Sequence, residues 1–180
     1  MSKKIKSNNS FQFLLIVFAG LLAILLIAVY FNKSSNNSYN QSQITNNSNG
    51  TKMYKSKTLK FTIDLPSKFQ VEEKFTTVFM KNINGLISIE RIGTNYTDLE
   101  GYLRDLESKN RILIANKEEL KVNDLHGIRG TITHPISHNI DEKAYFIYVD
   151  KWMVFTISTS SPALFGDLDK IAQSFRYTPN

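Results

Sequence analysis

The sequence predicts an α+β domain with a mostly antiparallel sheet flanked by helices, preceded by one transmembrane helix. An apolar stretch of membrane-spanning length occupies residues 11–31, and an Asn- and Ser-rich segment follows it at 32–52. The remainder, 53–180, alternates short runs of period-two hydrophobicity with two stretches of helical spacing. Hairpins mixed with two amphipathic helices are typical of an α+β domain built around one core.

The apolar stretch FQFLLIVFAGLLAILLIAVYF predicts a membrane-spanning helix at 11–31. Gln12 is its one strongly polar side chain, and about 20 helical residues span the hydrocarbon core of a bilayer. Cleavage as a secretory signal peptide is the competing interpretation, but the apolar regions of signal peptides run about 7–15 residues and end in small side chains. This stretch is longer and closes on Tyr30 and Phe31, which suit the membrane interface. We therefore expect an uncleaved signal anchor that contacts the lipid bilayer.

Lysine placement predicts which side of the membrane each part occupies. Lys3, Lys4 and Lys6 precede the apolar stretch, whereas Lys33 alone follows it closely. The positive-inside bias places residues 1–10 in the cytoplasm and the C-terminal domain outside it, in a single-pass protein of the cell membrane. A type IV pilin also begins with an apolar helix, but its Gly/Phe processing site followed by Glu is missing.

Composition identifies a linker and excludes several kinds of partner and site. The segment 32–52 is too polar to form a core, so it predicts a disordered linker to the domain at 53–180. The net charge of +6 arises mainly from lysines before residue 53, which leaves the domain nearly neutral and argues against a nucleic-acid partner. Cysteine is absent, which excludes disulfides, thiolate metal sites, Cys nucleophiles and a lipidated N-terminal Cys.

The first half of the domain predicts three strands. Alternating apolar residues at 59–65 form the first, which Pro66 ends. Strands at 76–81 and 86–92 follow, joined by Asn82-Ile83-Asn84-Gly85, a turn sequence that suits the positive φ angles of a hairpin.

The next segment predicts a helix and four further strands. Thr97 and Glu100 have the spacing of a capping box, and leucines at helical spacing follow, which predicts a helix over 98–110. The pair Asp150-Lys151 forms a tight turn between the last two strands. The four strands are expected at 112–120, 127–134, 143–149 and 152–159.

The C-terminal segment predicts a second helix over 162–174. Ser161 is placed to cap it, and Pro162 at the first helical position loses no hydrogen bond. One apolar stripe would face the sheet, formed by Leu164, Phe165, Leu168, Ile171 and Ala172.

The two ends of the domain resemble the Mog1/PsbP-like family, which includes PsbP-type photosystem proteins and DcrB-like bacterial lipoproteins. The opening is Tyr54-x4-Leu59-x-Phe61-x-Ile63-x-Leu65-Pro66-x2-Phe69 and the close is Tyr145-x-Ile147, Phe155-x-Ile157-x-Thr159-Ser160-Ser161-Pro162 and Ile171-x2-Ser174-Phe175. The resemblance covers most of 54–177 and implies an antiparallel sheet flanked by helices. It implies a binding or assembly module attached to a larger complex, and it implies no catalytic residue. No feature peculiar to oxygen evolution is visible.

One cluster carries metal-ligand side chains. His134, His138, Asp141 and Glu142 lie within nine positions, and imidazole with carboxylate suits Zn²⁺ or Mn²⁺. Pro135 argues against a helix that would place both histidines on one face, so a solvated loop between two strands is the alternative interpretation.

Other chemistry-bearing residues predict no active site. The serines at 158–161 lack a Gly-x-Ser-x-Gly elbow. The pairs Glu72-Glu73 and Glu118-Glu119 point to opposite faces of a strand and are expected to be solvated charge. Aromatic side chains are expected in the core, with a partner-binding patch as the alternative, at Tyr145, Phe146, Tyr148 and Trp152.

These observations predict a membrane-tethered, extracytoplasmic binding or assembly module that is not an enzyme, uses no cofactor, and acts on another envelope protein. The alternative function is a metal or small-ligand binding or sensing domain that uses the loop at 134–142.

Overall fold

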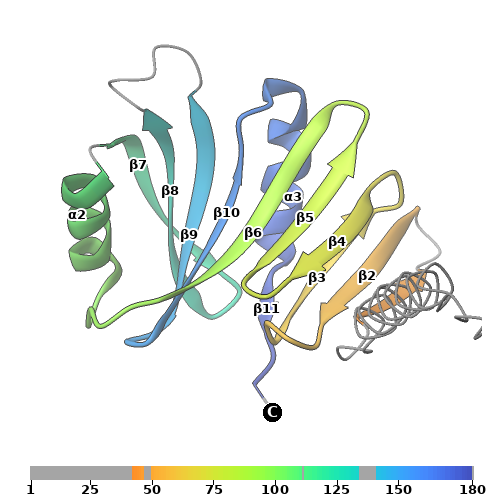
Figure 1. The fold of residues 1–180 in the computed structure, drawn as a ribbon, viewed down its shortest axis with the longest axis horizontal. Coiled ribbons are helices and arrows are strands. Elements are labelled where there is room, and N and C mark those ends of the chain that lie inside the picture. The colour runs from red at the N-terminus through yellow and green to blue at the C-terminus, as the bar shows by residue number, and fades with distance from the viewer. Residues whose placement is uncertain (1–41, 47–49, 111, 134–140, 180) are drawn as a thin grey trace, which may run out of the picture. The chain divides into compact units, whose positions relative to one another are not determined.

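Two antiparallel sheets and two α-helices make up the part of the chain described in the computed structural model (Figure 1), which comprises residues 42–46, 50–110, 112–133 and 141–179. All of these residues belong to one compact unit, Asn40–Asn180. Among them no helix has the length and apolar character needed to cross a membrane. The predicted anchor at 11–31 and the cytoplasmic N-terminus at 1–10 lie outside the described residues.

The smaller sheet has the strand order β1-β2-β3-β11 and is antiparallel throughout. The predicted strand at 59–65 is β3, two residues later than expected. Ordered structure begins earlier than the predicted domain boundary, because β1 lies inside the predicted linker at 32–52. Its residues pair with β2, and backbone hydrogen bonds to that strand hold them in a strand although their polar side chains do not indicate one. The strands are Gln43–Asn46 (β1), Thr51–Ser56 (β2), Phe61–Pro66 (β3) and Arg176–Tyr177 (β11).

The larger sheet has the order β4-β5-β6-β10-β9-β8-β7, again with every neighbouring pair antiparallel. Both predicted hairpin turns are present, with Gly85 at φ 137° in one and the Trp152 N–H bonded to the Asp150 carboxylate in the other. The predicted strands are found within three residues of their expected ends, and β4 is additional. The strands are Gln70–Lys74 (β4), Thr77–Asn82 (β5), Gly85–Gly93 (β6), Leu113–Val122 (β7), Leu125–Thr133 (β8), Glu142–Asp150 (β9) and Met153–Thr159 (β10).

The first helix, α2 (Leu99–Asn110), confirms the predicted element but not its cap. Asp98 accepts a hydrogen bond from the Gly101 N–H at 2.6 Å, which is the contact expected of an N-cap residue. Thr97 instead donates to the Asp98 carboxylate at 3.5 Å. The capping residue is therefore one position later than predicted.

The second predicted helix is divided into a 3₁₀ turn, η1 (Pro162–Leu164), and α3 (Phe165–Ser174). Ser161 makes no side-chain capping bond. Its hydroxyl donates to the Asn84 carbonyl at 2.7 Å and so ties the start of η1 to the β5–β6 turn. Ser161 therefore stands at the predicted N-cap position with Pro162 after it, but its hydroxyl bonds the β5–β6 turn instead of a backbone N–H of the helix.

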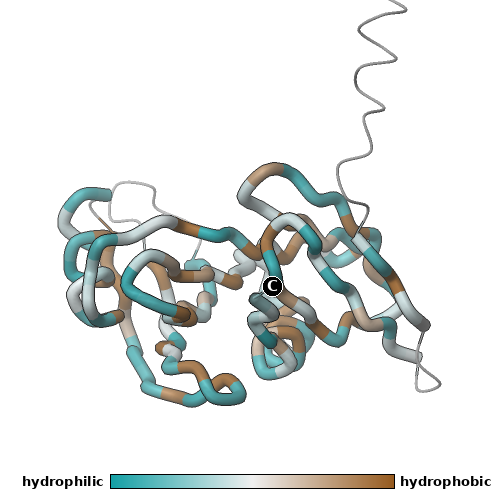
Figure 2. The backbone as a smooth tube through the Cα atoms, turned by 90° about the horizontal axis from the view of Figure 1, so that it is seen from below, coloured by the Kyte–Doolittle hydropathy of each residue, from teal (hydrophilic) through white to brown (hydrophobic). Residues whose placement is uncertain are grey.

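The main hydrophobic core lies between the two sheets and α3. Phe61 of β3, Phe155 of β10 and Phe175 after α3 meet in it, with ring centroids 5.0 to 5.7 Å apart. All three side chains are fully buried. Aromatic burial of this kind contributes several kcal/mol per ring. In Figure 2, hydrophobic positions alternate with hydrophilic ones along the strands, as half-buried strands require.

A second, smaller core lies on the opposite face of the larger sheet, beneath α2. Leu99 and Leu103 of the helix pack there with Ile128, Phe146 and Val154 of three neighbouring strands. The larger sheet is therefore covered by α2 on one face, and by α3 with the smaller sheet on the other.

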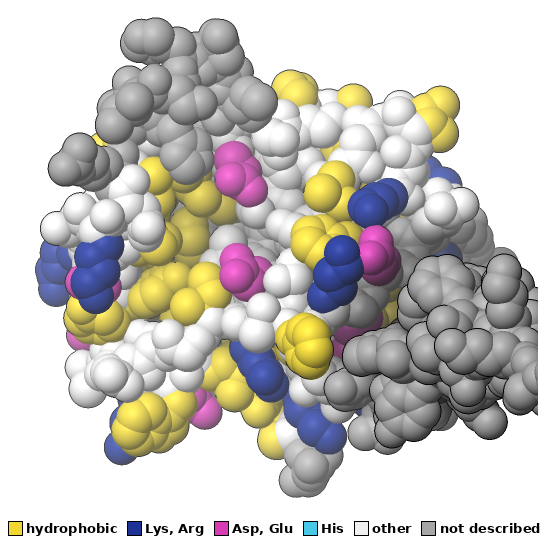
Figure 3. Space-filling model, viewed as in Figure 1, with side chains coloured by type: hydrophobic (Ala, Val, Ile, Leu, Met, Phe, Trp, Pro, Cys, Tyr) yellow, Lys and Arg dark blue, Asp and Glu magenta, His cyan; other side chains and the backbone are white. Residues whose placement is uncertain are grey.

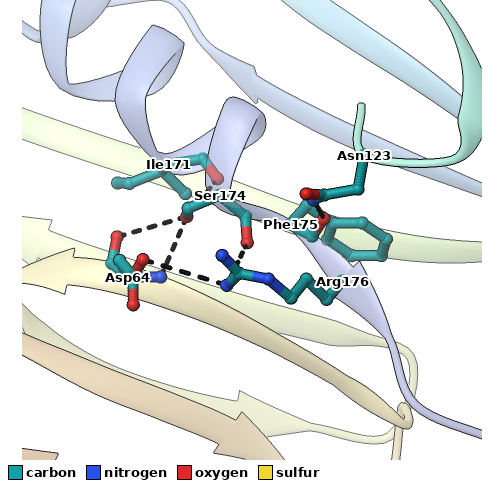
Figure 4. A network of polar contacts seen from close by, with 6 residues as sticks. All are labelled: Asp64, Asn123, Ile171, Ser174, Phe175 and Arg176. Carbon is teal, nitrogen blue, oxygen red and sulfur yellow. Dashed lines mark hydrogen bonds and ion pairs between the residues drawn. The ribbon is translucent and has the colours of Figure 1, made fainter. Parts of the chain in front are cut away.

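A polar network fixes the end of α3 (Figure 4). The Ser174 hydroxyl donates to the Ile171 carbonyl at 2.8 Å and accepts from the Asp64 N–H at 2.9 Å. Arg176 reaches the Ser174 carbonyl, and the Asn123 amide donates to the Phe175 carbonyl at 2.6 Å. These bonds join the helix to β3 and to the β7–β8 turn, which closes the domain at its C-terminal end.

Candidate binding site

A charged hollow of about 450 Å³ lies where β7, β8 and β9 meet the beginning of α3. Charges of both signs surround it together with one aromatic ring. We call this site the charged hollow; its principal lining residues are Glu118, Arg129, Thr131, Asp141, Lys143 and Phe165.

Two backbone features shape the charged hollow. β7 carries a bulge between Ala115 and Glu118, where Asn116 adopts a left-handed φ of 51°, and bulges of this kind re-aim the side chains that follow them. Gly130 of β8 lies opposite, and a Cβ at this position would stand 2.7 Å from the Ile114 side chain. The strands approach closely here because residue 130 has no side chain.

An ion-paired network borders the charged hollow. Lys143 Nζ lies 2.6 and 2.8 Å from the two Asp169 carboxylate oxygens, and the Tyr145 hydroxyl donates to the same carboxylate at 2.5 Å. Arg129 pairs with Glu118 across the neighbouring strands. The Lys143 ammonium also stands over the Phe165 ring, 5.4 Å from its centroid. Each cation is thus held in place before any partner arrives.

Electrostatics fixes the protonation of this network at neutral pH. Burial alone would raise the pKa of Asp169, but the Lys143 ammonium and the Tyr145 hydroxyl outweigh it, so the pKa lies below its ordinary value. Burial, helped by the bond to Asp169, raises the pKa of Tyr145 to about 12. Asp169 therefore remains ionised and Tyr145 protonated, so neither is poised to exchange protons with a substrate.

The predicted metal-ligand residues fall partly inside the described chain. Asp141 lines the charged hollow and accepts a hydrogen bond from the Thr133 hydroxyl at 3.0 Å. Glu142 is the first residue of β9. His134 and His138 lie outside the described residues. Within the described ranges no three His, Cys, Asp or Glu side chains are grouped as metal ligands, so the metal site remains a prediction.

A second carboxylate centre was missed by sequence reasoning. Glu73 of β4 accepts hydrogen bonds from the Ser42 and Tyr54 hydroxyls and, at 2.8 Å, from Ser56. Burial alone would raise the pKa of Glu73, but these bonds outweigh it and lower the pKa, whereas burial and Glu73 together raise the pKa of Tyr54. The expectation that Glu73 is solvated charge is wrong. The signal was Tyr54 and Ser56, two hydroxyls at period-two spacing on one strand face.

Aromatic side chains divide between core and surface. Tyr145 and Phe146 are buried as predicted, whereas Trp152 is 59% exposed. Core packing is therefore the wrong expectation for Trp152, because it stands in the tight β9–β10 turn, outside the sheet. It borders a second hollow of about 550 Å³ beside α2, lined also by Ile92, Tyr96 and Leu106.

Comparison with known proteins supports the fold. No family model matches the sequence, and no curated protein matches it. The solution structure of cyanobacterial PsbP (CyanoP) from Synechocystis sp. PCC 6803 is similar, with a TM-score of 0.53 over 71% of this chain and 92% of that chain, at 10% sequence identity. At this identity the likeness shows the fold alone. The described domain therefore has a PsbP-like fold with antiparallel sheets.

Proposed function

We propose that this chain is a membrane-tethered, extracytoplasmic binding or assembly module without catalytic activity, and that it binds another envelope protein through the charged hollow. The observation that carries the proposal is the preorganised set of opposite charges around one aromatic ring. Lys143 is fixed between Asp169 and Phe165, and Arg129 is fixed by Glu118. Charges held in this way recognise a partner with little further ordering.

The chemistry of the charged hollow suits a polar protein segment. The Glu118 side chain is 60% exposed and that of Arg129 is 35% exposed, so both reach solvent. Arginine and aromatic side chains are enriched where proteins meet, and partly exposed charge pairs set specificity more than affinity. A partner segment that carries both an acidic and a basic side chain fits this arrangement.

The proposed absence of catalysis is supported by the protonation states at the site. The pKa of Asp169 is lowered and the pKa of Tyr145 is raised. Both values are moved away from pH 7, whereas a general base or acid works best with a pKa near the operating pH. The resemblance to the Mog1/PsbP-like family points in the same direction, because it implies binding and assembly modules.

Site-specific crosslinking in intact cells tests the proposal. A photoreactive amino acid at Thr131, in the charged hollow, should capture an envelope protein with the full-length chain. The same amino acid at Ile83, which is 98% exposed in the β5–β6 turn, serves as the control. Arg129→Glu should abolish the adduct, whereas Arg104→Glu on the exposed side of α2 should preserve it. An adduct of equal yield from both crosslinking positions, or none from Thr131, would overturn the proposal.

Metal or small-ligand binding is the second candidate function. It is favoured by the position of Asp141 on the rim of the charged hollow. Titration of the full-length protein with Zn²⁺ and Mn²⁺ tests it, and His134→Ala with Asp141→Asn should remove any binding observed. Binding that survives both changes would exclude the predicted ligand set.

A further inference from the structure

Two exposed aromatic side chains lie at the same end of the larger sheet. Phe75, in the β4–β5 turn, is 78% exposed, and Trp152, in the β9–β10 turn, is 59% exposed. The strands that follow these turns both begin against the last residues of β6, because Thr77 pairs with Glu90 and Met153 pairs with Gly93. The two turns are therefore neighbours beyond one end of β6, at the lower end of the view in Figure 1.

Basic side chains accompany both aromatic residues. Lys74 precedes Phe75, and Lys151 stands over the Trp152 ring with its Nζ 4.9 Å from the centroid. Arg91 of β6 lies between the two turns, where its N–H donates to the Thr76 carbonyl.

The β2–β3 turn adds two more lysines to this end. The Arg91 guanidinium donates to the Thr58 carbonyl at 3.4 Å, which places the turn beside β6. Lys57 and Lys60 flank Thr58 in that turn. In Figure 3, hydrophobic and basic side chains gather along the lower edge of the molecule. We call this surface the basic aromatic end; it comprises Lys57, Lys60, Lys74, Phe75, Arg91, Lys151 and Trp152.

Two acidic residues at this end are engaged by neighbouring groups. Asp150 accepts a hydrogen bond from the Trp152 N–H at 2.7 Å. Glu72 is shared between Lys74 and Lys81, each at 3.1 Å. Glu73, bonded to Ser56 beside the β2–β3 turn, and Glu90, which pairs with Thr77, also lie near this end, so the five basic side chains exceed the four carboxylates by one.

The chain enters the domain at the same end. Gln43, the first residue of β1, pairs with Lys55 near the end of β2, and β2 leads directly into the lysine-bearing turn. The predicted span ends at residue 31, about ten residues before β1. A chain of this length reaches at most about 40 Å, so a tethered domain keeps this end near the bilayer.

We propose that the basic aromatic end docks onto the anionic headgroup layer of the membrane that holds the tether. This inference rests on the tether in the proposed function and adds a second, reversible membrane contact made by the folded domain. Phe75 and Trp152 enter the interface, where aromatic side chains are favoured, and the lysines and arginine meet lipid phosphates.

Docking in this way orients the charged hollow. β9 runs from Glu142, next to Asp141 on the rim of the hollow, to Asp150 at the basic aromatic end. Nine strand residues span about 30 Å. The hollow is thus held away from the bilayer and presented to the extracytoplasmic space.

The single tryptophan of the chain provides the test. Full-length protein is reconstituted into vesicles of phosphatidylcholine alone or of phosphatidylcholine with phosphatidylglycerol in equal amounts, each with or without brominated acyl chains. Trp152 emission should shift to the blue and lose most of its intensity to the brominated lipid in the anionic vesicles. Both effects should fade in 1 M salt, where screening acts within about 3 Å.

Variants separate the two parts of the contact. Phe75→Ser and the combined change Lys74→Gln with Lys151→Gln should each reduce the quenching. Ile83→Ser, at the opposite end of β5 and 98% exposed, should leave it unchanged.

Flotation of the vesicles distinguishes the possible failures. A chain that does not float with vesicles refutes the tether. A chain that floats while Trp152 stays accessible to iodide and unquenched by brominated lipid overturns the docking proposal alone. Protection of Trp152 that appears only in native membranes, and not in protein-free vesicles, would also overturn it and would identify a protein as the occupant.

Discussion

Two carboxylates in the described part of the domain each accept a hydrogen bond from a buried tyrosine, but different kinds of neighbouring groups stabilise their charges. Glu73 accepts hydrogen bonds from the Tyr54 hydroxyl and from two serine hydroxyls. Asp169 accepts a hydrogen bond from the Tyr145 hydroxyl and forms an ion pair with the Lys143 ammonium. The pKa of each carboxyl lies below its ordinary value although burial opposes this. One carboxylate is thus held by neutral donors and the other mainly by a cation.

This difference separates a structural role from a binding role. Glu73 lies on β4 of the larger sheet, and its donors Tyr54 and Ser56 lie on β2 of the smaller one, so the centre joins the two sheets. Asp169 lies beside the charged hollow, where Lys143 retains contact with solvent. Removing Glu73 leaves buried donors without an acceptor, whereas removing Asp169 leaves a cation that water can reach.

The largest expected effect is the loss of stability when the Glu73 carboxylate is removed, and the matching change at Asp169 provides the comparison. Glu73→Ala should lower the free energy of unfolding by about 3 kcal/mol, because several hydroxyls lose their acceptor, one of them on the buried Tyr54. Asp169→Ala should lower it by about 1 kcal/mol. Urea unfolding of the full-length protein in detergent, followed by circular dichroism, measures both. Equal losses would remove the distinction between the two centres.

Lowering the pH should reduce the contribution of Glu73 to folding stability, whereas a glutamine at this position does not titrate. The folded pKa of Glu73 lies below its ordinary value of 4.5, so its contribution is complete above that pH and is lost as the pH falls below it. Glu73→Gln should therefore be less stable than the natural protein at pH 7, and the gap should narrow as the pH falls through 4.5. Melting temperatures measured from pH 7 to pH 3 test this. A gap that stays constant would show that the charge of Glu73 does not contribute.

Removing one hydroxyl from each centre should give smaller effects in the same order. Tyr54→Phe should cost about 1 kcal/mol, and Tyr145→Phe about 0.5 kcal/mol, because Lys143 still neutralises Asp169. Denaturant midpoints of the two variants provide the comparison. A larger loss from Tyr145→Phe would reverse the proposed roles.

The smallest stability effect is expected at Arg129. Its pairing with Glu118 is partly exposed, and such pairs contribute about 0–1 kcal/mol. Arg129→Ala should leave the unfolding midpoint nearly unchanged while it weakens crosslinking from Thr131. Loss of both stability and crosslinking would show that Arg129 supports the fold and would leave its part in binding unproven.

Much of the fold follows from patterns that the sequence shows openly. β3, β6 and β10 carry period-two hydrophobicity, and α2 and α3 carry helical spacing, so burial and local conformation agree in them. β1, β2 and β4 were missed because they are short strands at or near sheet edges, where pairing partners rather than hydrophobic side chains determine the conformation.

The candidate site was less predictable because it depends on contacts between distant segments. Asp141 was singled out, but its neighbours in the charged hollow were not, since Arg129 and Lys143 come together with Asp169 only when α3 packs on the sheet. Glu73 was placed correctly on a strand face, yet its solvation depends on the smaller sheet that covers it. Period-two spacing tells which face a side chain occupies and does not tell what lies opposite.

The position of the C-terminal strand governs how the protein can be labelled. Tyr177 pairs with Phe61 at the beginning of β3, and the Thr178 N–H donates to the Lys60 carbonyl, so the chain leaves the domain at the end where β1 enters it (Figure 1). A fluorescent protein fused to the C-terminus would therefore crowd the surface proposed to meet the membrane. A short epitope inserted at Ile83, at the far end of β5, would report on the protein while both termini and the basic aromatic end stay unobstructed.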